Sequence, residues 1–221
     1  MIRRPAPLAC LLASLLVRPA LACDTALVLA IDVSNSVDAA EYRLQVDGMA
    51  DALADPEILQ AAVDGQVAIA VLQWSGVGRQ EVSIPWRRIG VAADALALSA
   101  EARALPRAFT LSDTAPAEAV MAGLALFGEV PDCRRRIIDV SGDGTPNAGG
   151  SVPAARTAAE QAGVTINGLA IESLGRGQPI TSFFARRLVT GDGFVITARG
   201  HRDYPEAIRR KILREISRVF G

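Results

Sequence analysis

Two hydrophobic patterns alternate along the chain from residue 27 onward. Continuous or strictly alternating apolar stretches are typical of strands, and they occur at 27–31, 67–74, 81–89, 136–140, 164–171 and 194–197. Apolar residues at helical spacing predict helices at 38–53, 93–105, 115–127, 152–162 and 204–220. The helix at 38–53 has a capping box, Asp38 and Glu41, at its start, and Asp55-Pro56 ends it.

The order of these segments predicts the fold class. Strands and helices alternate, and apolar strands need cover on both faces, so we expect an α/β fold with a doubly wound, mostly parallel sheet and helices on both sides. The alternating segment 81–89 contains Pro85, which is typical of an edge strand, here an antiparallel one. No repeat or Pro/Gly-rich linker divides residues 23–221, so we expect a single domain.

The N-terminal segment is predicted to be a signal peptide, residues 1–22. Arg3 and Arg4 precede an apolar stretch that is too short to span a bilayer, and Ala20-Leu21-Ala22 fits a signal peptidase site. The mature protein would therefore be periplasmic or secreted. A second interpretation makes Leu21-Ala22-Cys23 a lipobox with Cys23 lipid-anchored. The formal net charge of the chain, -1, gives no basic excess for nucleic acid.

The cysteines predict a disulfide. Cleavage would remove Cys10 and leave Cys23 and Cys133, an even number in an oxidising compartment, where thiols pair. Each of the two precedes a predicted strand that ends in an acidic loop. If those strands are parallel neighbours, both cysteines lie at the same edge of the sheet and can form a Cys23–Cys133 bond. Lipidation of Cys23 would exclude that bond.

Oxygen-bearing side chains gather where predicted strands end. Ligands of such sheets bind beyond the carboxyl ends of the strands, and residues two apart in an extended segment point the same way. Carboxylates and hydroxyls without histidine or cysteine select Mg²⁺, Mn²⁺ or Ca²⁺ over zinc or copper. We therefore predict a site for one divalent cation formed by Asp32, Ser34, Ser36, Thr114 and Asp143.

These motifs resemble a known family. Asp32-x-Ser34-x-Ser36, a later threonine and Ser141-Gly142-Asp143-Gly144 are similar to the metal-ion-dependent adhesion site (MIDAS) of von Willebrand factor type A (VWA) domains. The resemblance covers Asp24 to the terminal helix and is strongest to a poorly characterised group of secreted bacterial proteins. It implies a Rossmann-like fold in which the hydroxyls bind the ion directly or nearly so and the aspartates often bind through water. One position of the ion then stays open for an Asp or Glu of a protein partner.

The second motif departs from the family pattern. Asp113 stands where glycine usually precedes the threonine, which leaves Thr110 and Ser112 as alternative ligands, although the spacing to the helix favours Thr114. The third motif reads Ser-Gly-Asp-Gly where many relatives have Thr-Asp-Gly, and this change keeps the aspartate.

Three functions compete at this point. The leading hypothesis is a non-enzymatic, cation-dependent binding module. The first alternative is a Mg²⁺-dependent hydrolase or phosphatase with Asp32 as nucleophile, although Ser34 stands where the haloacid dehalogenase group has a second aspartate. A serine hydrolase would need His201 as its base, and no Gly-x-Ser-x-Gly accompanies it. The other alternative is a structural envelope protein with a vestigial site.

Several polar residues also have ordinary structural interpretations. Ser36 or Asp38 could cap the first helix, Thr114 could cap the helix at 115–127, and Asp143-Gly144 could form only a turn. Asp139, inside a strand, needs a partner if buried, such as Arg136 or a donor from a neighbouring loop. We expect His201 and the cluster Arg209-Arg210-Lys211 to be solvated.

Overall fold

The computed structural model describes residues 23–172 and 179–217. Its sheet has six strands in the order β3-β2-β1-β4-β5-β6. Their bounds are β1 (Thr25–Asp32), β2 (Ala68–Trp74), β3 (Gln80–Arg88), β4 (Arg135–Gly142), β5 (Thr165–Ile171) and β6 (Val195–Ala198). All neighbouring strands are parallel except β2 and β3. The predicted fold class is therefore confirmed, whereas the predicted signal peptide lies outside the described residues.

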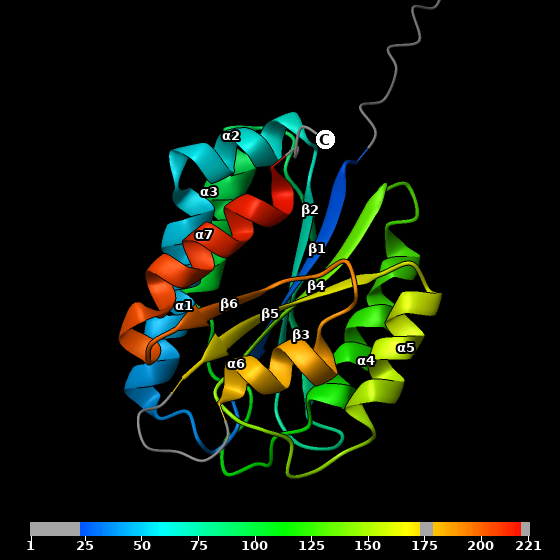
Figure 1. Ribbon diagram of the computed structural model, residues 1–221. Helices are drawn as coiled ribbons and strands as arrows, with labels where there is room; N and C mark the ends of the chain where they lie inside the picture. Colours follow the sequence, from blue (N-terminus) through cyan, green and yellow to red (C-terminus); the bar gives the residue numbers. More distant parts are fainter. Residues whose placement is uncertain (1–22, 173–178, 218–221) are drawn as a thin grey trace, which may run out of the picture.

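Helices cover both faces of the sheet. They are α1 (Ala39–Ala54), α2 (Pro56–Asp64), α3 (Ala92–Arg103), α4 (Pro116–Leu126), α5 (Val152–Gln161), α6 (Ile180–Phe183) and α7 (Tyr204–Ile216). Helices α1, α2, α3 and α7 pack together on one face, and α4, α5 and α6 cover the other (Figure 1). A π-helical stretch, η2 (Phe184–Leu188), continues α6, and a short 3-10 helix, η3 (His201–Asp203), precedes α7.

Two helices, α2 and α6, were not predicted from the sequence. Asp55-Pro56 does end α1, but it also starts α2, because the Asp55 side chain accepts the N–H groups of Glu57 and Ile58 and Pro56 occupies the first turn. The same dipeptide therefore works as a stop signal and as a start signal.

The central strand β1 explains the continuous apolar pattern. Its residues are buried throughout. Leu27, Leu29 and Ile31 pack against the helices of one face, while Ala26, Val28 and Ala30 join the core on the other face. Because successive side chains of a strand point to opposite faces, a strand covered on both sides has no solvent-facing positions. The polar residues of β1, Thr25 and Asp32, stand at its two ends.

The disulfide between Cys23 and Cys133 is present, as predicted. Strands β1 and β4 are parallel neighbours, with Thr25 opposite Arg135, so the residues that precede them meet at the amino edge of the sheet. The bond closes a loop with a sequence separation of 110 residues. In the chain-entropy model such a loop stabilises the fold by about 4 to 5 kcal/mol. The sulfur of Cys23 is then not available for a thioether to lipid.

Lys211 corrects two predictions about polar residues. It is not solvated but fully buried, and its Nζ lies 2.7 Å from Asp139 Oδ1 and 2.6 Å from Glu215 Oε1. Lys211 rather than Arg136 is thus the partner of the strand carboxylate Asp139. Burial raises the pKa of Asp139, and burial together with the nearby Asp139 raises the pKa of Glu215 to about 8. One lysine between two buried carboxyl groups joins α7 to the sheet.

Candidate metal site

The register of β1 and β4 brings the first and third motifs together. Ile31 lies opposite Ser141, so Asp32, the last residue of β1, and Asp143, the first residue after β4, meet at the carboxyl edge of the sheet. Asp32 also lies opposite Trp74 at the end of β2. Both aspartates are buried. The sheet topology therefore places two carboxylates, separated by more than a hundred residues in sequence, at one point.

Four of the predicted residues form a connected chain of hydrogen bonds. Asp32 Oδ1 accepts the backbone N–H of Ser34 at 2.8 Å. The hydroxyl oxygens of Ser34 and Ser36 are 3.1 Å apart, and the Ser36 hydroxyl donates to Asp143 Oδ1 at 2.5 Å. Ser34 is fully buried, whereas Ser36 is partly open to solvent. The alternate positions 32, 34 and 36 thus converge on Asp143.

Thr114 occupies the position expected of the second motif. It is buried, and a Cβ atom added at Gly144 would lie 3.5 Å from its methyl carbon and 3.6 Å from its hydroxyl oxygen, so the Thr114 side chain lies against the third loop. The Ser112 hydroxyl instead accepts the N–H of Gly76 at 3.2 Å, and Thr110 is exposed. The geometry thus favours Thr114 over both alternatives.

The electrostatics of the cluster fit a cation. Burial, and to a lesser extent the carboxylate of Asp143, raises the pKa of Asp32 to about 7. Asp32 Oδ2 is buried and has no hydrogen-bond partner within the described residues. A buried carboxylate oxygen without a partner is unfavourable unless a proton or a cation compensates it.

Glycine keeps space beside these oxygens. A Cβ atom at Gly142 would lie only 3.1 Å from Asp32 Oδ2, so a larger residue there would crowd this oxygen.

The donor set suits a hard divalent cation, because it combines the carboxylates of Asp32 and Asp143 with the hydroxyls of Ser34, Ser36 and Thr114. No cluster of three or more His, Cys, Asp or Glu residues suited to a metal occurs in ranges 23–172 and 179–217, so a site here depends on hydroxyls.

Two residues that support the site were not identified from the sequence. Arg107 donates from Nη2 to the carbonyls of Val33 at 3.0 Å and Ser34 at 2.8 Å, which holds the loop after β1 in place. Asn147 Oδ1 accepts the N–H of Thr114 at 2.8 Å. Arg107 has no local signal in the sequence, because its partners are far away along the chain. Asn147 lies in the third loop, where asparagine is common in turns, so its role at the site was not recognised from the sequence.

The ordinary structural roles fall on other residues. Asp38 forms the capping box of α1 with Glu41, and Ala115 is the N-cap of α4, so Thr114 does not cap that helix. The prediction of a solvated His201 was wrong, because this residue is buried with its Nδ1 3.1 Å from Glu41 Oε1. Its Nε2 has no hydrogen-bond partner in the described part of the chain.

Comparison with known families identifies the chain. Residues 22–220 match the family described as "Protein of unknown function (DUF1194)". The chain belongs to this DUF1194 family. No curated protein matches this DUF1194 chain. None of its helices in the described ranges has the length and apolar character needed to cross a membrane.

Several solved structures have a similar fold, and one of them is described as a vWF domain. Proximal thread matrix protein 1 (PTMP1) from the mussel byssus has a TM-score of 0.65 at 15% identity, over 89% of this chain and 47% of that one. The pilus adhesin SpaC from Lactobacillus rhamnosus GG has a TM-score of 0.66 at 15% identity, over 88% of this chain and 30% of that one. The vWF domain of the type V pili tip protein Mfa5 from Porphyromonas gingivalis has a TM-score of 0.61 at 11% identity, over 91% of this chain and 99% of that one.

These likenesses show that the DUF1194 chain has a VWA-like fold. It spans less than half of PTMP1 and of SpaC. Another PTMP1 structure, with a TM-score of 0.62 at 17% identity over 87% of this chain and 46% of that one, is described as having a zinc-occupied MIDAS motif.

Proposed function

We propose that this chain is an exported, non-enzymatic binding module that holds one divalent cation and uses it to bind an acidic side chain of a partner protein. The residues that would hold the cation are Asp32, Ser34, Ser36, Thr114 and Asp143. The observation that carries the proposal is the connected oxygen cluster at the carboxyl edge of the sheet, with Asp32 Oδ2 buried and without a partner.

The donor set points to Mg²⁺, Mn²⁺ or Ca²⁺. Hydroxyl and carboxylate oxygens are the ligands that these hard cations prefer. The description of PTMP1 with zinc in its MIDAS motif supports a divalent ion in a fold of this kind. Zinc therefore belongs among the ions to be compared experimentally.

The charge of the site favours an anionic partner group. Three of the five donors are neutral hydroxyls, so the ion would keep an affinity for a further carboxylate. The partly exposed Ser36 marks the side on which the cluster reaches solvent.

Exposed apolar side chains near this edge support a protein partner. The segment that leads to Thr114 contains Leu111, which is 89% exposed. The carbonyl of Ser112 accepts the N–H of Asn35, so this segment lies against the loop after β1. Val77, in the turn after β2, is 63% exposed. Apolar groups beside a charged centre are the composition expected of a protein-binding surface.

Metal titration of the chain from residue 23 onward, with its disulfide intact, tests the cation site. Isothermal titration with Mg²⁺, Mn²⁺, Ca²⁺ and Zn²⁺ is expected to show one saturable site. Asp32→Ala and Thr114→Val should weaken it by at least about tenfold. Ser112→Ala is the matched control, since it removes a hydroxyl from the same loop and should leave the affinity unchanged. Absence of binding of all four ions, or equal affinity in all variants, would contradict the proposal.

Partner binding is tested separately. Pull-down from the native envelope should retain a partner in the presence of Mg²⁺ and lose it with EDTA and with Asp32→Ala. A partner retained equally under all three conditions would favour a structural protein with a vestigial site. A phosphatase assay on the same Mg²⁺-loaded sample distinguishes the enzymatic alternative, and activity that disappears with Asp32→Ala would replace the binding hypothesis.

A further inference from the structure

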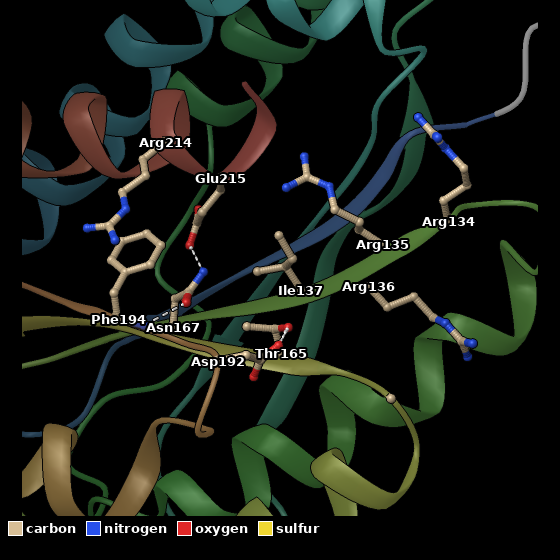
Figure 2. A pocket seen from close by; sticks show the side chains of 11 residues that line it. Arg134, Arg135, Arg136, Ile137, Thr165, Asn167, Asp192, Phe194, Arg214 and Glu215 are labelled. Carbon is tan, nitrogen blue, oxygen red and sulfur yellow. Dashed lines mark hydrogen bonds between the residues drawn. The ribbon is translucent and has the colours of Figure 1, made fainter. Parts of the chain in front are cut away.

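A second candidate site lies at the amino edge of the sheet, opposite the proposed metal site. A pocket of about 410 Å³ opens there between the first residues of β4 and β5, the residues before β6 and the last turn of α7. Figure 2 shows Arg135 and Arg214 on either side of Glu215, with Phe194, Thr165 and Asp192 below them. We call it the arginine pocket. None of its residues belongs to the metal site.

The side chain of Arg135 forms its hydrogen bond with a neutral group and not with a carboxylate. Its Nη2 donates to the neutral hydroxyl of Thr25 at 2.7 Å, while the neighbouring Arg134 forms the ion pair with Asp24. Desolvation lowers the pKa of Arg135 more than the nearby carboxylates raise it. The carboxylates that act on Arg135 are those of Asp24, which is paired with Arg134, and Glu215, which is bonded to Lys211. Most N–H donors of this guanidinium thus remain available to a ligand.

Arg214 is held in a fixed orientation on the opposite wall. Its guanidinium carbon lies 3.8 Å from the centre of the Phe194 ring, and such stacking leaves the N–H groups at the rim of the guanidinium plane free to donate. Stacking also restricts the side chain before any ligand arrives, so less conformational entropy is lost on binding.

The acids of the pocket accept hydrogen bonds from its wall, and only Glu215 Oε2 has no partner within the described residues. Asp192 accepts the hydroxyls of Thr165 at 2.5 Å and Thr190 at 2.7 Å. Glu215 Oε1 accepts from Asn167 at 2.9 Å and from Lys211 at 2.6 Å. These carboxylates are therefore committed to neighbours other than the two arginines, and the pocket keeps a positive character.

We infer that the arginine pocket binds a small ligand with a carboxylate or phosphate group, held by Arg135 and Arg214. The planar fork of a guanidinium donates two parallel hydrogen bonds to either kind of oxyanion. The volume fits a small organic anion. This site is independent of the divalent cation, because it lies at the other end of the strands.

The test is titration of the chain from residue 23 onward, stripped of metal with EDTA and then dialysed into EDTA-free buffer at constant ionic strength, once with inorganic phosphate and once with citrate. Removal of the metal makes the result independent of the metal site, and removal of EDTA prevents its carboxylates from competing for the pocket. We expect saturable binding of at least one probe, weakened about tenfold or more in both Arg135→Gln and Arg214→Gln. The matched control is Arg202→Gln, which removes an exposed arginine at the opposite end of the molecule.

The outcomes separate the ligand classes and the role of each residue. Binding of phosphate alone assigns a phosphorylated ligand, and binding of citrate alone assigns a carboxylate ligand. Arg135→Lys, which keeps the charge but loses the fork, should bind more weakly than the wild type. If thermal unfolding shows that Arg135→Gln is not folded, Arg214→Gln and Arg135→Lys decide the question. No saturable binding of either probe, or equal affinity in Arg214→Gln and Arg202→Gln, would overturn the inference.

Discussion

Replacement of Lys211 by methionine should destabilise this protein in a pH-dependent way. Lys211 has no exposed surface, and Asp139 and Glu215 are each only 1% exposed. Removal of one partner from a buried ion cluster leaves uncompensated charge and typically costs about 3 to 5 kcal/mol. Folded domains are stable by about 5 to 15 kcal/mol in total. Lys211→Met should therefore remove a large part of the free energy of unfolding.

The sign of the pH dependence follows from the two carboxyl groups. Burial raises the pKa values of Asp139 and Glu215, while Lys211 lowers both. A group whose pKa is raised by folding contributes stability below its ordinary pKa, 4.5 for Glu215, and that stability is lost as the pH rises toward about 8. Without Lys211 both pKa values rise further. The loss of stability in Lys211→Met is thus expected to be larger at pH 8 than at pH 5.

Urea denaturation followed by circular dichroism at pH 5 and pH 8 measures this effect. The matched control is Arg210→Met, which removes a cation from the exposed face of the same helix and should change the free energy of unfolding by less than about 0.5 kcal/mol. Addition of Glu215→Gln to Lys211→Met should recover part of the loss at pH 8, because one buried carboxylate is then neutral. A loss of stability equal at the two pH values, or equal in Lys211→Met and Arg210→Met, would refute the reasoning.

Two further predictions concern the disulfide and the loop after β1. Reduction of Cys23–Cys133 should lower the free energy of unfolding by about 4 to 5 kcal/mol and the melting temperature by roughly 10 to 20 °C; thermal unfolding with and without dithiothreitol checks this, and an unchanged melting temperature would contradict it. Arg107→Met should leave two loop carbonyls without a charged donor, which weakens the fold by about 1.5 to 3 kcal/mol and also reduces the affinity for Mg²⁺. Titration calorimetry on folded Arg107→Met measures the second effect, and wild-type affinity would show that the metal loop does not depend on this residue.

Local patterns in the sequence were sufficient to predict the six strands and the helices other than α2 and α6, and they named the residues proposed for the metal site. Strands buried on both faces are largely apolar, and the capping box formed by Asp38 and Glu41 spans only four residues, so both can be recognised in the sequence alone. The alternation of Asp32, Ser34 and Ser36 after a strand is a local signal as well. Even the disulfide followed from local positions, once β1 and β4 were assumed to be neighbours.

Tertiary structure decided the roles that depend on partners far away along the chain. Thr114 was chosen over Ser112 as a metal ligand because the Thr114 side chain lies against Gly144 of the third loop, whereas the Ser112 hydroxyl accepts the N–H of Gly76. The burial of Lys211 depends on how α7 packs against the sheet, where Nζ meets Asp139 of β4, since the neighbouring Arg209 and Arg210 have the same local pattern and remain near the surface.

The arginine pocket also depends on residues that are far apart in the sequence. Arg135, Phe194 and Arg214 come from β4, from the segment before β6 and from α7, and each reads separately as a surface residue or a packing residue. Periodicity and capping depend on neighbours within one or two turns of the chain, so the sequence determines them by itself. The meeting of distant charges depends on strand order, register and helix packing, which the whole chain decides together.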